Sequence, residues 1–548
     1  MPKMSGGEAL VRTLVREGVE VIFGLPGVQM YGIITAIRDT PGIRMITARH
    51  EGTTTYMADG YARAGNRVGV ALVVPGPGVY NAGGGMSTAF SASSPVLLIA
   101  GQIPRDIIGK NTGGLHEIND QLEAITPVTK WRKRVLWPSD VSGAVHEAFR
   151  QLKTGRPRPV HVELPPDAMV EVADIEIPEP SPVDRKPAAP DAIRKAAAML
   201  RAAKNPVIWA GGGVHSSNAH AELEALADAL QAPVMTSAAG KGVISDRHPL
   251  CLGASLGPIG QLREYLDSSD LVLVIGSRFA AATPPAGTQV IHLDIDPEEI
   301  GRNHKKTFAL LGDVKGTLPM LTTAIKTDGK ISRPGLKESI AATRARVNES
   351  WDERDEPQDS LTKSVRKGIP EDGILIAGMT QVGYYSRPHY PVYHPRTYLD
   401  SGYSGNLGYE YPFALGVKVA RPDKAVVSIS GDGGFGYYSG ELATAVKYGI
   451  NVVAVVFNDN AFGNVARDLD QDFGGQYEAS LHNPDFMKLA EAYGVVGMRA
   501  KEPTDVGSLV AKAVTLDKPV LIEVPVSRMP RPKMWVRRAA WTKPAKVT

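Results

Sequence analysis

The stretch that decides the fold covers residues 425–460 and reads AVVSISGDGGFGYYSGELATAVKYGINVVAVVFNDN. Two apolar runs rich in valine, residues 425–430 and 450–457, flank residues 439–447, whose apolar side chains have helical spacing. Near-continuous apolar runs indicate strands covered on both faces, and a helix between two of them is typical of a parallel βαβ unit. The stretch therefore predicts an α/β domain built on a parallel sheet.

Polar residues follow each of these two predicted strands. Residues 431–434 (Gly-Asp-Gly-Gly) come after the first strand, and residues 458–460 (Asn-Asp-Asn) come after the second. Adjacent strands lie about 4.8 Å apart and ligands bind at their carboxyl ends, so Asp432 and Asp459 can reach one cation. Carboxylates and phosphate oxygens suit Mg²⁺, and glycines let backbone N–H groups approach a phosphate. An ordinary turn is the alternative, but two such strand ends at this spacing favour a diphosphate and metal site.

The same alternation of apolar runs and amphipathic stretches continues along the chain, with further runs at residues 70–74, 96–100, 207–210, 271–275 and 290–293. It predicts an α/β protein with three doubly wound parallel-sheet domains. Polar, proline-containing connectors at residues 177–191 and 327–335 place these domains at 1–176, 190–326 and 356–548, the last with a basic C-terminal tail. The sequence leaves open whether the first and third domains share a fold.

Composition narrows the class of protein. The 548 residues are 43% hydrophobic and 22% charged, with a net charge of +3, which gives no reason to expect a nucleic-acid partner. The single cysteine, Cys251, excludes an internal disulfide and lies in an apolar run that predicts a buried thiol. The chain has no run of about 18 apolar residues and no signal segment, so we expect a cytoplasmic protein without a membrane partner.

A second candidate site lies near the N-terminus. Residues 46–63 read ITARHEGTTTYMADGYAR, which places Glu51 after a short apolar run and before a helical stretch. A buried carboxyl group at this point would favour its neutral form and could exchange a proton near neutral pH. An exposed glutamate that stabilises the positive end of a helix is the alternative.

Taken together, these motifs resemble those of thiamine diphosphate enzymes. That family has Gly-Asp-Gly followed after some 25 to 30 residues by Asn-Asn, and residues 23–27 and 76–81 resemble its pyrimidine-binding domain. The resemblance implies pyrimidine-binding, central and diphosphate-binding domains, in that order. It also implies that Glu51 activates the cofactor through its pyrimidine ring. Asp459 departs from the family motif, which has Asn there.

The resemblance assigns roles to further residues. The metal ligands would be Asp432, Asp459 and the carbonyl of Ala461, with Asn458 or Asn460 as the alternative to Asp459. Leu407 would bend the cofactor and the Gly405 carbonyl would accept from its amino group, so Glu51, His116, Gly405 and Leu407 form the expected catalytic set. The expected cofactor-binding residues are Pro26, Gly27, Glu51, Pro77, Asn81, Gly405, Leu407, Gly431, Asp432, Gly433, Gly434, Asp459, Ala461, Phe462 and Gly463.

The chain is most similar to the acetolactate synthase-like branch, through residues 23–27, 101–104, 276–279 and 292–297. This branch implies Mg²⁺-dependent decarboxylation of a small, pyruvate-like 2-oxo acid and ligation to a second carbonyl compound, with sites between the subunits of a homodimer or homotetramer. A decarboxylase, oxidase or acyltransferase of the same fold is the alternative, and a non-catalytic homologue is a remote one.

Several positions depart from the pattern of this branch. The family's catalytic Gln falls on His116, which either exchanges protons with the substrate or lies on the surface. A Trp that selects the acceptor aligns with Asp468. A pair of Asp residues becomes Ala280-Ala281, which leaves binding of FAD uncertain.

Overall fold

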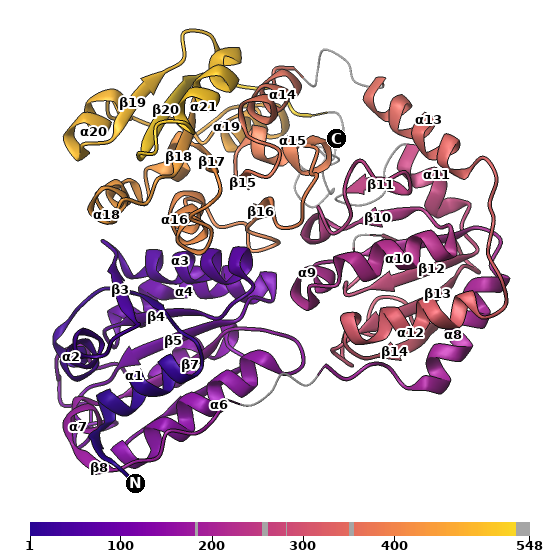
Figure 1. Ribbon diagram of the computed structural model, residues 1–548. Coiled ribbons are helices and arrows are strands. Elements are labelled where there is room, and N and C mark those ends of the chain that lie inside the picture. Colours follow the sequence, from indigo (N-terminus) through magenta and orange to yellow (C-terminus); the bar gives the residue numbers. More distant parts are fainter. Residues whose placement is uncertain (181–184, 255–260, 281, 350–355, 533–548) are drawn as a thin grey trace, which may run out of the picture.

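The computed structural model describes residues 1–180, 185–254, 261–280, 282–349 and 356–532 (Figure 1). Three six-stranded sheets account for nearly all of the strands, and every strand pairing within them is parallel. The predicted fold class is therefore confirmed. The predicted domain boundaries stay predictions, and most of the basic tail, residues 533–548, lies outside the described residues.

The N-terminal domain has the strand order β3-β2-β4-β5-β7-β6. Its strands are β2 (Val21–Gly24), β3 (Arg44–Thr47), β4 (Gly69–Val73), β5 (Val96–Gly101), β6 (Trp131–Arg134) and β7 (Val160–Leu164). Alternate residues of β4 face opposite sides, since Val70 and Leu72 join one apolar cluster while Ala71 and Val73 join another. One face is covered by α1 (Gly6–Arg16), α2 (Tyr31–Asp39) and α6 (Val141–Lys153), and the other by α3 (Glu51–Gly65) and α4 (Pro77–Ala92).

The C-terminal domain repeats this topology. Its order is β16-β15-β17-β18-β20-β19, which matches the N-terminal sheet strand for strand when each set is numbered from its own first strand. The strands are β15 (Ile374–Ala377), β16 (Tyr398–Asp400), β17 (Val426–Gly431), β18 (Val453–Asn458), β19 (Val496–Arg499) and β20 (Val520–Pro525). The outer face carries α14 (Gln358–Gly368), α15 (Gln381–His389) and α21 (Val506–Ala513), and the inner face carries α16 (Glu410–Ala420), α18 (Leu442–Tyr448) and α20 (Phe486–Tyr493). The first and third domains therefore do share a fold.

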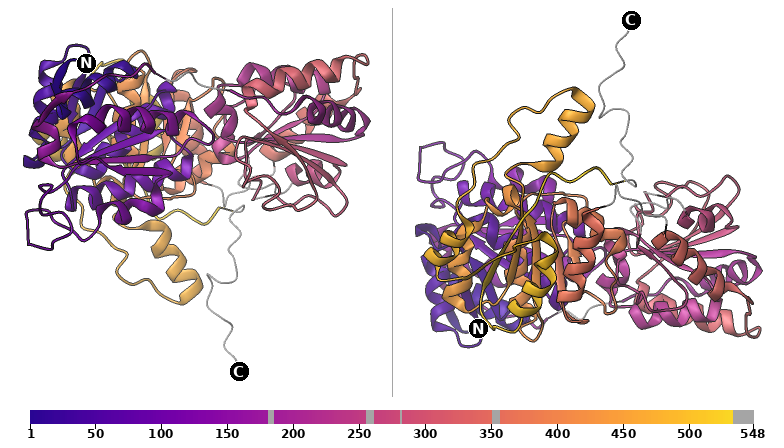
Figure 2. Two further views of the ribbon diagram at one scale, coloured as in Figure 1. Left: turned by 90° about the horizontal axis from the view of Figure 1, so that it is seen from below. Right: turned by 90° about the horizontal axis from the view of Figure 1, so that it is seen from above.

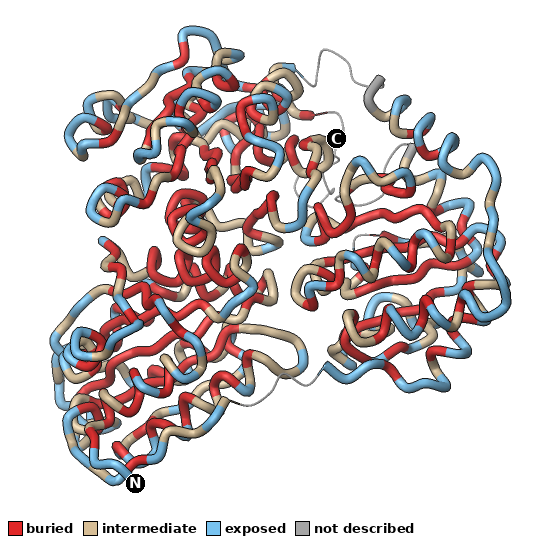
Figure 3. The backbone as a smooth tube through the Cα atoms, in the orientation of Figure 1, coloured by how far each residue is buried: buried red, intermediate tan, exposed pale blue. Residues whose placement is uncertain are grey.

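These two domains pack against each other through their inner helices. One apolar cluster contains residues of both domains, and Figure 3 shows the buried segments of α3 and α16 between the two sheets. The helices approach closely, because a Cβ atom added at Gly416 would come within 1.9 Å of the Met57 carbonyl oxygen. The Arg63 side chain donates to the Asp400 carbonyl at 2.6 Å. The N- and C-terminal domains thus share one continuous core.

The central domain has a different strand order, β11-β10-β9-β12-β13-β14, and a core of its own. Figure 2 shows it to one side of the paired domains. Its strands are β9 (Pro206–Ala210), β10 (Val234–Thr236), β11 (Cys251–Ala254), β12 (Leu271–Ile275), β13 (Gln289–Asp294) and β14 (Thr307–Leu311). Its helices include α8 (Pro190–Ala202), α10 (His220–Leu230), α12 (Val314–Lys326) and α13 (Leu336–Glu349), which contributes Ile340 to the core. Cys251 is buried there, as predicted.

Two smaller features complete the described chain. A short antiparallel pair, β1 (Lys3–Ser5) with β8 (Val172–Asp174), joins the two ends of the N-terminal domain. Within the described ranges, no helix has the length and apolar character needed to cross a membrane.

Candidate functional site

One group of predicted site residues lies at the carboxyl edge of the N-terminal sheet. Pro26 and Gly27 follow β2, Glu51 opens α3 after β3, and Pro77 opens α4 after β4. These three strands are neighbours in the sheet, so their loops meet at one edge. Asn81 Nδ2 donates to Glu51 Oε2 at 3.0 Å. The fold therefore brings together residues that are up to 55 positions apart in the sequence.

The start of α3 is held by the C-terminal domain. The His50 side chain caps the helix, accepting from the Gly52 amide at 3.0 Å, and its ring lies 5.5 Å from that of Tyr438. Glu441 accepts from the Arg49 amide at 2.8 Å. The expectation of a buried Glu51 needs correction, because this side chain is only half-buried in the single chain. It lies at the open edge of the sheet rather than in the core.

His116 also lies at this edge. A Cβ atom added at Gly76 would lie 2.4 Å from the His116 carbonyl oxygen, so the residue preceding Pro77 has to be glycine. Gln29 Nε2 donates to the Leu115 carbonyl at 3.1 Å, and Gln29 Oε1 lies 3.2 Å from His116 Nδ1. Because the carbonyl can only accept, the amide oxygen must face the ring, and Nδ1 must carry the proton. In the neutral form of the ring, the nitrogen without a proton is therefore Nε2.

A second group lies at the carboxyl edge of the C-terminal sheet. The loops after four neighbouring strands meet there, namely residues 401–408 after β16, 378–380 after β15, 432–434 after β17 and 459–463 after β18. Asn406 fixes the first of these loops to the N-terminal domain, because its Nδ2 donates to the Tyr56 hydroxyl and to the Gly84 carbonyl, each at 2.9 Å. This loop, residues 401–408, carries Gly405 and Leu407 and lies beside the other three loops.

Two acids and an amide form the centre of this second group. Asp432, which opens the short helix α17 (Asp432–Phe435), is 2% exposed, and Asn483 Nδ2 donates to its Oδ2 at 2.6 Å. Burial raises the pKa of Asp432, an effect that Asn483 opposes. Burial and the nearby Asp432 carboxylate raise the pKa of Asp459 to about 6. Two acids that disfavour each other's ionised form would both be stabilised by a cation between them.

The surrounding oxygen atoms fit a magnesium ion. The Asn483 amide nitrogen lies 3.0 Å from Asn458 Oδ1 and 3.3 Å from Asn460 Oδ1, in addition to its contact with Asp432. Three oxygens thus converge on one N–H₂ group that has only two hydrogens to donate, which marks a place suited to positive charge. Among the described residues, no group of three or more His, Cys, Asp or Glu side chains could hold a metal by itself. Two carboxylates, a main-chain carbonyl and the oxygens of a diphosphate make the set that Mg²⁺ uses.

The loop that carries the remaining predicted residues is held rigidly. Ala461 forms a bridge with Ser480, and the Phe462 amide donates to the Ala479 carbonyl at 2.8 Å. A Cβ atom added at Gly463 would lie 2.2 Å from Asp459 Oδ2, so a larger residue there would displace that carboxylate. Asn483 and Gln29 were missed in the sequence, since each lies outside the motifs and acts through one side chain that only the fold brings into place.

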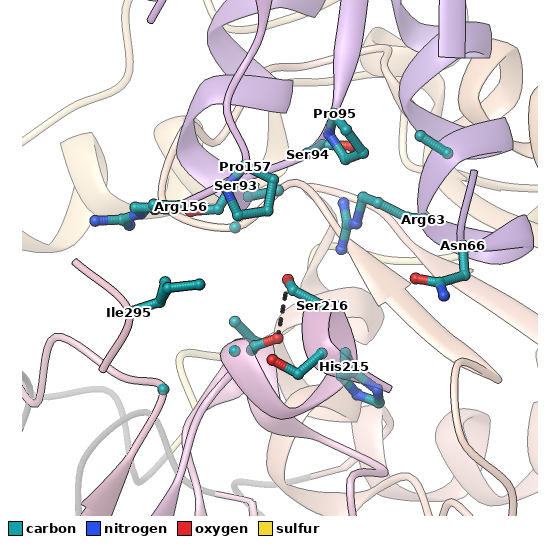
Figure 4. A pocket seen from close by; sticks show the side chains of 18 of the residues that line it. Arg63, Asn66, Ser93, Ser94, Pro95, Arg156, Pro157, His215, Ser216 and Ile295 are labelled. Atoms are coloured by element: carbon teal, nitrogen blue, oxygen red, sulfur yellow. Dashed lines mark hydrogen bonds between the residues drawn. The ribbon is translucent and has the colours of Figure 1, made fainter. Parts of the chain in front are cut away.

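A pocket of about 810 Å³ lies where the three domains meet (Figure 4). Arg63 of α3 and Asn66, which follows that helix, face His215 and Ser216 of the central domain across the pocket. Arg156 and Ile295 lie to one side. Burial and the nearby Arg396 guanidinium lower the pKa of His215 to about 3. The pocket has room for a nucleotide-sized ligand, which keeps the question of FAD open. Ala280 lines it, and Ala281 lies outside the described residues.

Comparison with known proteins identifies all three domains. Residues 4–124 match the family model "Thiamine pyrophosphate enzyme, N-terminal TPP binding domain", residues 193–321 match the central domain and residues 378–524 match the C-terminal TPP binding domain. A probable acetolactate synthase large subunit of Methanocaldococcus jannaschii is 34% identical, over 95% of this chain and 92% of the relative. The acetolactate synthase large subunit of Haemophilus influenzae is 33% identical, over 96% and 95%. A probable 2-ketoarginine decarboxylase of Pseudomonas aeruginosa is 32% identical, over 92% and 90%.

Proposed function

The chain belongs to the thiamine pyrophosphate enzyme family, and on this premise we propose that it uses thiamine diphosphate and Mg²⁺ to decarboxylate a small 2-oxo acid and to join the remaining fragment to a second carbonyl compound. The placement of Asp432 and Asp459 at the ends of the adjacent strands β17 and β18 carries the proposal. The sequence similarity of this chain to acetolactate synthases supports the ligation step.

Each group of residues has a distinct task. Asp432, Asp459 and the Ala461 carbonyl hold Mg²⁺, and the backbone of residues 431–434 and 461–463 receives the diphosphate. When bound, the cofactor supplies the electron sink for cleavage of the carbon–carbon bond. Gly405 and Leu407 orient it, and Pro26, Gly27 and Pro77 shape the place for its pyrimidine ring.

Glu51 and His116 handle protons. The Glu51 carboxyl group, which Asn81 orients, would exchange a proton with the pyrimidine ring of the cofactor. The unprotonated Nε2 of His116 takes a proton from the substrate or product, while Gln29 keeps the ring in that tautomer.

The complete site needs a second subunit. Val28, Tyr80 and Leu115 expose large apolar side chains near the N-terminal group, as expected of a surface that another subunit covers. We therefore place the site between the subunits of a homodimer or homotetramer.

Product analysis tests the reaction. A panel of 2-oxo acids is incubated with and without a second aldehyde or 2-oxo acid, and the products are identified by mass spectrometry. We expect ligated products. Release of the aldehyde alone under both conditions would instead support a plain decarboxylase, an activity suggested by the similarity to a probable 2-ketoarginine decarboxylase.

A variant of Glu51 tests the mechanism. Glu51→Gln should lose turnover and keep its fold, because the amide cannot exchange the proton that the carboxyl group handles. Glu20→Gln, which alters an exposed ion pair with Arg67, serves as the matched control and should remain active. Full activity of Glu51→Gln would refute the assignment.

A test for a ligand in the interdomain pocket distinguishes the flavin-dependent alternatives from the others. A purified protein that shows flavin absorption in visible light would favour an oxidase or an enzyme that retains FAD. A colourless protein that is stabilised against heat by an adenine nucleotide, and not by FAD, would assign the pocket to a smaller ligand.

A further inference from the structure

The first residue of α16 is a buried glutamate whose role no motif explains. Glu410 is 1% exposed, although most glutamates lie at the surface. Its carboxyl group lies between the loops after β15 and β17, because a Cβ atom added at Gly378 would come within 2.5 Å of Oε1 and one at Gly434 within 3.8 Å of Oε2. Gly434 belongs to a loop that receives the diphosphate in the proposed function, and Gly378 directly follows the neighbouring strand β15. Glu410 thus lies directly beside the loop that forms this part of the cofactor cradle.

Only one of the two carboxyl oxygens is paired. The Met379 amide donates to Oε1 at 2.8 Å, whereas Oε2 has no hydrogen-bond partner among the described residues. A buried polar atom without a partner costs about 1–3 kcal/mol, and such atoms are rare in folded proteins. Oε2 therefore calls for a partner that the described part of the chain does not provide.

The environment of Glu410 favours its neutral form. Burial raises its pKa to about 7, and nearby amides only partly oppose this. The titratable groups that face it are phenols, namely Tyr56 of α3, Tyr384 of α15 and the adjacent Tyr409. The acid of α17, Asp432, is bonded to Asn483. None of these groups is a cation that would hold Glu410 ionised.

A neutral carboxyl group can donate where a carboxylate can only accept. A diphosphate offers many acceptor oxygens and would repel an ionised Glu410. We propose that Glu410 is a cofactor-binding residue that donates a hydrogen bond from a protonated Oε2 to the diphosphate. This inference rests on the proposed binding of thiamine diphosphate in the cradle. It predicts that the cofactor binds together with a proton once the pH exceeds about 7.

Calorimetric titration with thiamine diphosphate at saturating Mg²⁺ tests the proposal. In the unmodified protein, we expect affinity to fall by about tenfold for each pH unit above the pKa of Glu410, with uptake of about one proton on binding. Glu410→Gln always carries an N–H donor, so its affinity should stay near the low-pH value and its extra proton uptake should disappear. Ionisation of the diphosphate itself affects both proteins equally.

A second buried glutamate provides the matched control. Glu441 is also 1% exposed, but its oxygens accept from the Arg49 amide and the Thr444 hydroxyl. Glu441→Gln should keep the pH dependence of the unmodified protein. If Glu410→Gln does not fold, proton uptake by the unmodified protein decides by itself, and its absence overturns the proposal.

These experiments distinguish failure of the proposed function from failure of the role proposed for Glu410. If neither the unmodified protein nor either variant binds thiamine diphosphate at any pH, the proposed function fails. If Glu410→Gln and the unmodified protein bind it with the same pH dependence, only the role of Glu410 is overturned.

Discussion

Replacing Asp459 by asparagine should make the protein without cofactor more stable. This change restores the residue that the family motif has at this position. In the absence of metal, burial and Asp432 raise the pKa of Asp459 from its usual 3.8 to about 6. An acid with a raised pKa is disfavoured when ionised, so its contribution to stability falls as the pH rises from about 4 through about 6, and the full cost is present at neutral pH.

The magnitude follows from that difference. A change from 3.8 to about 6 corresponds to about 3 kcal/mol for a fully buried group. Asp459 is only partly buried, and solvent screening reduces this to about 1–2 kcal/mol. Asp459→Asn removes the charge and keeps an oxygen ligand, so the thermal unfolding midpoint of the cofactor-free variant should exceed that of the unmodified protein at neutral pH. The two midpoints should converge below about pH 4.

Binding of Mg²⁺ and diphosphate should have the opposite effect on the two proteins. Mg²⁺ with diphosphate neutralises the pair of acids. The unmodified protein should therefore gain more thermal stability from binding Mg²⁺ and diphosphate than the Asp459→Asn variant does. The matched control is Asp485→Asn, because the Met487 amide lowers the pKa of that acid at the start of α20 and the same change there should not stabilise. A cofactor-free Asp459→Asn protein that is no more stable than the unmodified one at neutral pH would refute the reasoning.

Two further predictions concern the N-terminal group and the contact between the domains. Gln29→Glu places a carboxylate against His116 Nδ1, which should keep the ring protonated to higher pH and move the acid limb of the kcat profile upward by about one unit; an unmoved limb would argue against a catalytic His116. Gly416→Ala forces a Cβ atom against the Met57 carbonyl and should cost about 1–3 kcal/mol in thermal unfolding, whereas Gly143→Ala in α6, where the added atom meets nothing within 4 Å, should not destabilise.

The sequence by itself determined the classes of element and the two motifs. Continuous apolar runs such as residues 453–457 predict buried parallel strands, because a strand covered by helices on both faces has no polar side. The placement of Asp432 and Asp459 followed as well, since parallel strands end at a common edge and local spacing then fixes which side chains meet.

Only the tertiary structure decided what surrounds those motifs. Asn483 reaches Asp432 across 51 positions and Gln29 reaches His116 across 87, and no local pattern encodes such contacts. Glu410 looks like an ordinary exposed acid at the start of a helix, and only the packing of α16 against the loops after β15 and β17 buries it. Local periodicity depends on hydrogen bonds and burial within one element, whereas the protonation and partners of a side chain depend on every element packed around it.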